Sequence, residues 1–435
     1  MTGPLEGVRV VDFSQLYQGP LATQMLADLG ADIVKVEPPR GDFFRTWSLG
    51  DRFPAGESLS FLAVNRNKRS IVIDLKRPGG RDVALQLIDR ADVLVENFRP
   101  GVMDRLGLGS AEVVTRNPRL VYCASSGYGP DGPYSDLPGQ DLLVQAIAGT
   151  MWLTGRRDDP PTAVGYGIAD AAAGLHIVIG VLAGLLERGR NGYGQRIDIN
   201  LLSSLVVLQS HEFSYYLNTG EPPVRPRSNT TAAYTGAPLG IYETRAGYLA
   251  LAMMPIGRLA AVIGATDLVS IDSSNEIENR DEIHARLEAV FRTRPREEWL
   301  ALLRASDIWC APVQSLGEAA DDPQVRWNGM VAEVEHPTVG SVQVVGRSVA
   351  FGRTPLSVLT APPLLGQHTI EILEEVGYDG PAIQALLGEG VVVQGGNVER
   401  SDVPVVGDGS SGSAITGRRA ALTETTEAPP GSIRS

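Results

Sequence analysis

Cysteine and histidine are scarce in this chain of 435 residues, which has two cysteines and five histidines. Cys123 and Cys310 cannot build a disulfide framework or a four-thiolate metal site. The histidines are isolated, and no His-x-x-x-His, Cys-x-x-Cys or Gly-x-Ser-x-Gly pattern occurs. The sequence therefore predicts neither a metal site nor a serine-hydrolase nucleophile.

Positive charge and long hydrophobic runs are also limited. The chain has 38 Lys+Arg against 51 Asp+Glu, a formal net charge of −13, which argues against a nucleic-acid or anionic-membrane surface. The longest apolar run, Ala171–Leu186, is interrupted by His176 and three glycines and does not predict a membrane span. The first residues lack a signal-peptide pattern and lead directly into an expected strand. We therefore expect a soluble, cytoplasmic protein.

Short runs rich in β-branched residues alternate with helical patterns over the first 200 residues. Strand, helix and strand at this spacing are typical of parallel βαβ units. The runs expected to form buried strands are Val8–Asp12, Ile33–Glu37, Ser70–Asp74, Asp92–Glu96, Leu120–Ser125 and Arg196–Asn200. The expected fold class is therefore α/β with a parallel sheet.

The character of the chain changes after residue 200. Residues 1–200 are expected to form the first part of a large domain, and residues 201–225 a linker that begins with one long apolar helix and ends in a Pro-rich stretch. Residues 226–325 predict a smaller α+β domain, and strand patterns return in residues 326–393. Residues 394–435 contain no aromatic residue and predict a disordered tail.

Two glycine-containing loops follow expected strands. The loop Gly127–Gly132 matches Gly-x-Gly-x-x-Gly, but Pro130 interrupts it and no helix opens directly after it, so it is a poor dinucleotide fingerprint. The second loop leads from Asp12 into Gly19-Pro20, where a helix with proline at its first position and free N–H groups would bind an anion. An ordinary βα loop is the alternative.

Basic residues recur in the loops that should follow these strands. They are Arg40, the run Asn65–Arg69, Lys76, Arg77, Arg99 and Arg105. In an acidic protein such a gathering favours a site for a polyphosphate, because charge-assisted hydrogen bonds hold phosphate oxygens. A solvated basic face is the alternative.

Two carboxylates each stand at the expected start of a helix. Asp170 precedes Ala171–Gly174, whose small side chains leave space above it, and Asp141 follows Pro138-Gly-Gln. A carboxylate at a helix N-terminus stays ionised and can act as a nucleophile. Either residue is equally suited to cap its own helix, so the residues alone leave both interpretations open.

Six ordered blocks of this sequence resemble the class III coenzyme A transferases, the family of formyl-CoA transferase and CaiB/BaiF. The blocks are Leu5–Pro39, Asn67–Lys76, Ala91–Gly101, Ser126–Pro133, Gly165–Gly174 and Pro363–Thr369. The resemblance implies a Rossmann-like large domain built from both chain ends, with the smaller domain inserted, and an interlaced homodimer. It implies acyl-CoA and a carboxylic acid as substrates, with no tightly bound cofactor and no metal.

The resemblance also implies roles for individual residues. Asp170 matches the aspartate that attacks the acyl-CoA thioester and then carries coenzyme A to a free carboxylate. The turn at Tyr17 and Gln18 matches the one whose N–H groups hold the oxyanion. The residues that match coenzyme A contacts are Arg40, Ile73, Lys76, Asn97, Arg105 and Asp141.

The sequence departs from two branches of this family. Tyr17 stands where formyl-CoA transferases have an active-site glutamine, and their glycine-run loop has no counterpart, which weakens the expectation of formyl or oxalyl chemistry. The Gly-His-Asp motif of α-methylacyl-CoA racemases reads Gly139-Gln140-Asp141 here. Two-base proton exchange would lack one base, so we favour a transferase over a racemase. The fold would also suit a non-catalytic acyl-CoA-binding paralogue or a nicotinamide dehydrogenase, since a fold does not fix a function.

Overall fold

The computed structural model describes residues 3–229, 232–266, 268, 277–354 and 360–395. All of these residues belong to one compact unit. The predicted tail from residue 394 onward lies outside the described residues, apart from Gln394 and Gly395.

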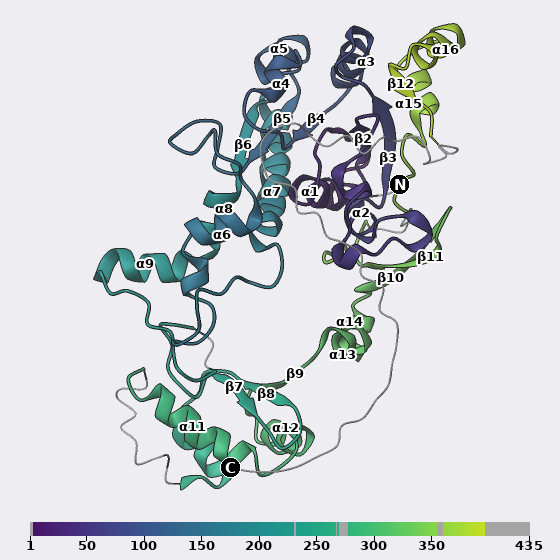
Figure 1. The fold of residues 1–435 in the computed structure, drawn as a ribbon. Helices are drawn as coiled ribbons and strands as arrows, with labels where there is room; N and C mark the ends of the chain where they lie inside the picture. Colours follow the sequence, from purple (N-terminus) through teal and green to yellow (C-terminus); the bar gives the residue numbers. More distant parts are fainter. Residues whose placement is uncertain (1–2, 230–231, 267, 269–276, 355–359, 396–435) are drawn as a thin grey trace, which may run out of the picture. The chain divides into compact units, whose positions relative to one another are not determined.

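A seven-stranded sheet has the strand order β12-β3-β2-β1-β4-β5-β6 (Figure 1). Its strands are β1 (Arg9–Asp12), β2 (Asp32–Glu37), β3 (Lys68–Ile73), β4 (Val93–Glu96), β5 (Val121–Ser126), β6 (Arg196–Asn200) and β12 (Val392–Val393). Strands β1 to β6 run parallel in the 3-2-1-4-5-6 order of a Rossmann fold, and β12 joins β3 antiparallel. The predicted α/β class and parallel sheet are confirmed.

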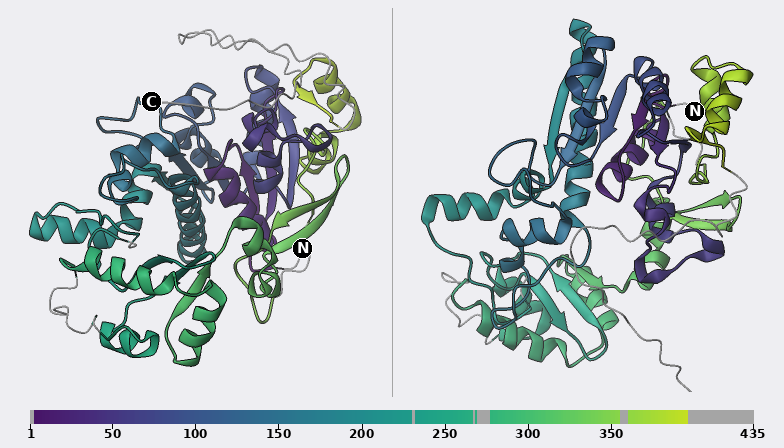
Figure 2. Two further views of the ribbon diagram at one scale, coloured as in Figure 1. Left: turned by 60° about the horizontal axis from the view of Figure 1, so that its bottom comes forward. Right: turned by 45° about the horizontal axis from the view of Figure 1, so that its top comes forward.

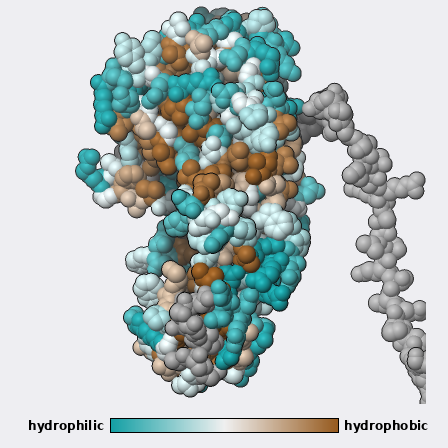
Figure 3. Space-filling model, turned by 90° about the vertical axis from the view of Figure 1, so that its left-hand side faces the viewer, coloured by the Kyte–Doolittle hydropathy of each residue, from teal (hydrophilic) through white to brown (hydrophobic). Residues whose placement is uncertain are grey.

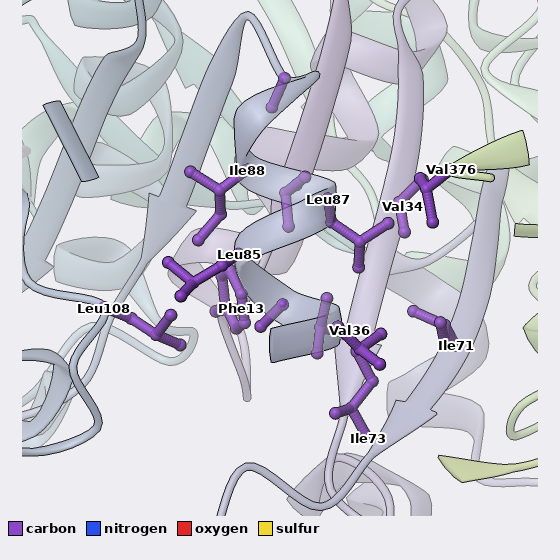
Figure 4. Close-up of a cluster of buried hydrophobic side chains, with 14 of the residues drawn as sticks. Phe13, Val34, Val36, Ile71, Ile73, Leu85, Leu87, Ile88, Leu108 and Val376 are labelled. Atoms are coloured by element: carbon purple, nitrogen blue, oxygen red, sulfur yellow. The ribbon is translucent and has the colours of Figure 1, made fainter. Parts of the chain in front are cut away.

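Helices cover both faces of this sheet because alternate strand residues point to opposite sides. On one face, α1 (Gln18–Asp28) and α7 (Ile168–Asn191) pack on residues such as Val10 and Val93. On the other, α3 (Pro78–Asp89) packs on Val34 and Ile71 (Figure 4). Further helices on this second side are α4 (Val102–Arg105), α5 (Ser110–Arg116), α15 (Thr369–Glu375) and α16 (Gly380–Gly388). The last two come from the end of the chain.

Two further helices, α6 (Asp141–Ile147) and α8 (Leu201–Leu208), pack against the start of α7, and α9 (Ser210–Thr219) follows α8. The prediction of one long helix from Leu201 is wrong, because Gln209, with φ −100° and ψ 25°, breaks it into two. The Pro-rich linker that follows is pinned by Arg225, which is buried and donates to the carbonyls of Thr154 (2.9 Å) and Pro160 (3.2 Å).

The middle of the chain has a separate hydrophobic cluster around Tyr242, Phe291 and Trp299. A three-stranded antiparallel sheet lies in this region (Figure 2), formed by β7 (Gly240–Glu243), β8 (Tyr248–Leu251) and β9 (Cys310–Val313). Its helices are α10 (Ile256–Ile263), α11 (Arg280–Phe291) and α12 (Arg296–Ala305). This region therefore combines helices with an antiparallel sheet, whereas the large sheet is mostly parallel.

The chain then passes through α13 (Leu316–Asp321) and α14 (Pro323–Trp327) into a hairpin of β10 (Val331–His336) and β11 (Gly340–Val345). Val342 and Val344 of the hairpin pack on Leu62 of α2 (Leu59–Val64).

Helix α7 is the one helix in the described part of the chain whose length and composition would allow it to cross a membrane. The core helix of a soluble protein meets the same criterion, and 39% of the apolar window of α7 is buried. Its buried residues Ile177 and Val181 belong to the core beneath the large sheet.

Candidate active site

The β1–α1 loop lies at the point where the strand order of the large sheet reverses, between β1 and β4. Ligands of open α/β sheets bind at this place, beyond the carboxyl ends of the strands. Tyr17 is the N-cap of α1, so the helix begins at Gln18, and Pro20 is its third residue rather than its first. Among the described residues, no acceptor is bonded to the N–H groups of Tyr17, Gln18 and Gly19. These donors are therefore free to bind an anion.

Asp170 is the third residue of α7, and the N-cap is Gly167, which makes no side-chain cap bond. The expectation that Asp170 caps its own helix is thus wrong. Asp141 performs this task from α6, since its Oδ2 accepts the N–H groups of Ala169 (2.7 Å) and Asp170 (3.1 Å). An acceptor supplied by another helix leaves the Asp170 carboxylate without a hydrogen-bond donor among the described residues.

Asp141 is itself held in place. Its other oxygen, Oδ1, accepts a bond from Nε2 of Gln145 (2.5 Å), and Oε1 of Gln145 accepts the N–H of Val164 (2.9 Å). Both oxygens of Asp141 therefore accept hydrogen bonds from the protein. The neighbouring carboxylate of Asp170 is the one left free to react.

Burial raises the pKa of Asp170 to about 7, and the negative charge of Asp141 acts in the same direction. A position in the first turn of a helix favours the ionised form, but the loss of hydration is the larger effect here. A carboxylate with a pKa near neutrality keeps more basicity than an ordinary aspartate. It is therefore a better nucleophile once it is ionised.

Tyr17, Asp141 and Asp170 surround Gly167. A methyl group at Gly167 would lie 3.6 Å from Asp141 Oδ2, 3.6 Å from Tyr17 Cδ1 and 3.7 Å from Asp170 Oδ2. Burial and the charges of the two aspartates raise the pKa of Tyr17, so its hydroxyl stays protonated and able to donate. The predicted residues Tyr17, Asp141 and Asp170 are thus brought together.

Gln18 contributes differently from Tyr17. Its side chain is buried, and its Oε1 accepts a bond from Oγ of Ser125 (2.7 Å) at the end of β5. The carbonyl of Gln18 lies 3.1 Å from the Cβ position of Gly174, which places the start of α1 against α7 one turn beyond Asp170. The side chain of Gln18 therefore anchors α1, and its backbone N–H is the group left free.

A cavity of about 530 Å³ lies between the loop after β3 and the helices α3 and α4. Lys76 and Arg105 both line it, and neither side chain has an ion-pair partner in the described part of the chain. Arg77 and Arg81 also line it but pair with Asp74 (3.3 Å) and Glu112, and Asp82 is the acid among its described lining residues. Such a cavity suits a phosphorylated ligand.

The model for CoA-transferase family III matches residues 5–369. The chain belongs to CoA-transferase family III. It is therefore a class III CoA transferase, and a nicotinamide dehydrogenase is excluded.

Named relatives of this CoA transferase differ in their substrates. The human succinyl-CoA:glutarate CoA-transferase is 38% identical over 400 residues, covering 90% of this chain and 90% of that protein. The formyl-CoA:oxalate CoA-transferase of Streptomyces avermitilis is 36% identical, covering 90% of this chain and 100% of that protein. A crystal structure of a CAIB/BAIF family protein from Brucella suis aligns with a TM-score of 0.77 at 31% identity, covering 86% and 100% of the two chains.

Three residues expected to contact coenzyme A have other surroundings in the transferase. Arg40 is exposed in the loop after β2, and Ile73 is buried at the end of β3. Asn97 uses its side-chain amide to hold both backbone groups of Gln15, at 2.8 and 2.7 Å. The structure brings Lys76 and Arg105 together in one cavity but does not place these three residues in it.

The basic run Asn65–Arg69 does not add to the cation-lined cavity. Its three cations pair inside the protein: Arg66 with Asp28 (2.5 Å), Lys68 with Asp12 (3.3 Å) and Arg69 with Asp32 (2.7 Å). A charge pattern in sequence cannot distinguish such internal pairs from ligand contacts.

Sequence reasoning missed several buried polar groups near the strand ends. Glu96 ends β4 beside a second cavity, of about 230 Å³, and burial raises its pKa to about 7. Lys35 and Asp42 form a fully buried pair behind the β1–α1 loop. The sequence does contain a signal for this buried pair, because a lysine stands inside the apolar run Ile33–Val36. Among the described residues, no group of His, Cys, Asp and Glu side chains could hold a metal ion.

Proposed function

We propose that this enzyme moves coenzyme A from an acyl-CoA thioester to a free carboxylic acid through covalent intermediates on Asp170. The observation that supports this most is the difference in hydrogen bonding between the two neighbouring aspartates. Both oxygens of Asp141 accept hydrogen bonds, whereas the half-buried carboxylate of Asp170 has no donor among the described residues and a pKa of about 7. A free, basic carboxylate in a half-enclosed site is suited to attack an acyl carbon.

The proposed reaction has four balanced steps. The Asp170 carboxylate attacks the thioester carbonyl, a C–O bond forms, the C–S bond breaks and coenzyme A leaves as a thiolate. The thiolate attacks the aspartyl carbonyl of this mixed anhydride, giving an aspartyl-CoA thioester and the donor acid. The acceptor carboxylate then attacks the aspartyl-CoA carbonyl: a C–O bond forms, the C–S bond breaks, and the coenzyme A thiolate leaves a second mixed anhydride. The thiolate finally attacks the acyl carbon of the acceptor: the new C–S bond forms, the anhydride C–O bond breaks, and the Asp170 carboxylate is released. Dividing one acyl exchange in this way replaces a difficult step with easier ones.

Charge that develops on the attacked oxygen needs donors already in position. The free N–H groups of Tyr17, Gln18 and Gly19 stand at the start of α1, and the Tyr17 side chain contacts the Gly167 position beside Asp170. Fixed donors in a partly buried site stabilise an oxyanion more than water does. We therefore assign the oxyanion site to this turn.

Coenzyme A would be held by the cation-lined cavity. Lys76 and Arg105 supply positive charge for its phosphates. Arg40 in the loop after β2, Ile73 at the end of β3 and Asn97 after β4 remain proposed contacts. For the acyl donor and the acceptor we propose short dicarboxylic acids, because the human and mouse relatives at 38% and 39% identity are named for succinyl-CoA and glutarate.

We also propose that the enzyme works in the cytoplasm as an interlaced homodimer. Leu175, Ile179, Leu182 and Leu186 form an exposed apolar stripe along α7. Hydrophobic side chains also gather on the face shown in Figure 3. An uncovered stripe of this length is typical of a subunit interface. Sedimentation equilibrium should give twice the chain mass of 46.4 kDa.

The decisive experiment traps the acyl-enzyme. The protein is mixed with succinyl-CoA, quenched with hydroxylamine and digested, and the peptide containing Asp170 should carry the hydroxamate. Asp170→Asn should give no label, whereas a label on Asp141 would contradict the mechanism. Glutarate should then yield glutaryl-CoA in the parent. Exchange of the α-proton of a 2-methylacyl-CoA with deuterated water would instead support a racemase.

A further inference from the structure

The backbone of the β1–α1 loop is held by side chains from other parts of the sheet. The Ser14 carbonyl accepts a bond from Nζ of Lys35 on β2 (2.8 Å). Both backbone groups of Gln15 are bonded to the amide of Asn97, which follows β4. The Ser14 carbonyl and both backbone groups of Gln15 are therefore tied to β2 and to the segment after β4.

Leu16 is the most constrained residue of the loop. Its φ of 68° lies in the left-handed region, which side chains other than glycine rarely adopt, and it directly precedes Tyr17. Its N–H donates to Oδ1 of Asp42 (3.1 Å). A strained residue persists only where its surroundings determine its conformation. At Leu16, the hydrogen bond from its N–H to the Asp42 carboxylate supplies this restraint.

Asp42 is in turn fixed by charge. Its Oδ2 lies 2.8 Å from Nζ of Lys35, and the two side chains are 1% and 0% exposed. Burial lowers the pKa of Lys35, but the charges of Asp42, Asp12 and Glu37 outweigh this and raise it above its usual value. Lys35 therefore stays charged across the physiological range. Neither side chain reaches the solvent, so neither can touch a substrate.

We propose that Asp42, held by Lys35, is a positioning residue for acyl transfer: it keeps Leu16 left-handed and thereby aims the free N–H groups of Tyr17, Gln18 and Gly19 at the oxyanion. This inference rests on the proposed reaction at Asp170. The loop is fixed up to Leu16 and its donors are free from Tyr17 onward, which is the arrangement that preorganised stabilisation requires.

The test compares variants of Asp42 in a single turnover. With succinyl-CoA in excess, the rate at which Asp170 is acylated is followed by the hydroxylamine trap. Asp42→Ala should slow acylation by roughly 100-fold, the effect of losing an oxyanion donor. Its dissociation constant for coenzyme A should stay within about threefold of the parent, because the pair does not touch the ligand. Asp42→Asn keeps an acceptor for the Leu16 N–H, so its acylation rate should lie between those of the parent and Asp42→Ala.

Two further variants separate positioning from general damage. Asp28→Asn breaks another buried ion pair, with Arg66, at the opposite end of α1, and should lower the melting temperature without slowing acylation. Leu16→Gly in the Asp42→Ala background removes the steric cost of a positive φ, so it should recover about fivefold of the lost rate. A structural defect would not be rescued in this way.

The outcomes are distinct. If the parent acquires no label from any acyl-CoA, the reaction at Asp170 is refuted and the positioning role falls with it. If the parent is labelled and Asp42→Ala is labelled at the same rate, only the positioning role is overturned. It is overturned equally if Asp28→Asn slows acylation as much as Asp42→Ala, or if Leu16→Gly restores nothing. Slow acylation with unchanged coenzyme A affinity and recovery by Leu16→Gly supports it.

Discussion

The two halves of the candidate site, one around Asp170 and the other around Lys76 and Arg105, differ in the sign and the hydration of their charges. Around Asp170, two carboxylates lie side by side in a half-enclosed space, and burial shifts the pKa of Asp170 to about 7. Around Lys76 and Arg105, like charges line a cavity in contact with solvent. Dehydration controls reactivity in the first half, whereas Coulomb attraction that salt can screen controls binding in the second. Variants in the two halves should therefore change different kinetic constants.

Replacing Asp170 should have the largest effect. Asp170→Asn should lower kcat by roughly four orders of magnitude or more, because the nucleophile is lost. The same change should raise the melting temperature at pH 8. The folded pKa of about 7 lies above the ordinary value of 3.8, so the parent loses stability as the pH rises through that window. Differential scanning calorimetry should show the difference shrink towards pH 4, and a constant difference would contradict the shifted pKa.

Removing a cation from the other half should change binding rather than chemistry. Arg105→Ala should raise the KM for acyl-CoA about tenfold with little change in kcat, because a charge-assisted phosphate contact is lost. In the parent, raising the salt concentration should weaken coenzyme A binding as well. Arg116→Ala, which breaks a surface pair with Asp89 at 2.5 Å, is the matched control and should leave KM unchanged. Equal affinity of Arg105→Ala and the parent would remove this cavity from the site.

The pH dependence should reveal the coupling between the two aspartates. Acylation should rise with pH through about 7, as Asp170 ionises. Asp141→Asn keeps an acceptor for α7 but removes the charge that raises the pKa of Asp170, so the midpoint should move to lower pH. Stopped-flow acylation rates from pH 5 to 9 measure this shift. An unchanged midpoint would show that burial alone sets the pKa.

Filling the space at Gly167 should have the smallest effect. The φ of Gly167 is −69°, so alanine is tolerated by the backbone, but its methyl group would contact Tyr17, Asp141 and Asp170. We expect Gly167→Ala to lower kcat/KM a few-fold while the melting temperature is maintained. A substitution without any kinetic effect would indicate that the acyl group approaches Asp170 from another side.

The sequence alone predicted the sheet well. Parallel strands are buried on both faces, so their sequences are continuous apolar runs rich in β-branched residues. The strand at Arg196–Asn200 matches its prediction, and the other parallel strands differ by one or two residues at their ends. The expectation of one long helix overlooked the break at Gln209, where the four consecutive polar residues Gln209–Glu212 interrupt the apolar pattern.

The site was predictable in part. Asp170 stood out because small residues follow it, but its cap comes from Asp141, 29 positions earlier in the chain. The roles of Asp42 and Asn97 depend in the same way on contacts between distant loops. Local patterns indicate which residue types are available, whereas only the tertiary structure shows which of them are already bonded.

The pairing of β12 with β3 has a consequence for how the protein is made. Ribosomes deliver about 5–20 residues per second, so the edge of β3 waits roughly 15–60 s for its partner, which follows about 320 residues later. During synthesis this nascent edge can pair with other chains. We therefore expect efficient production to depend on holdase chaperones, and fragments that stop before residue 392 to aggregate even though they contain every residue of the proposed active site.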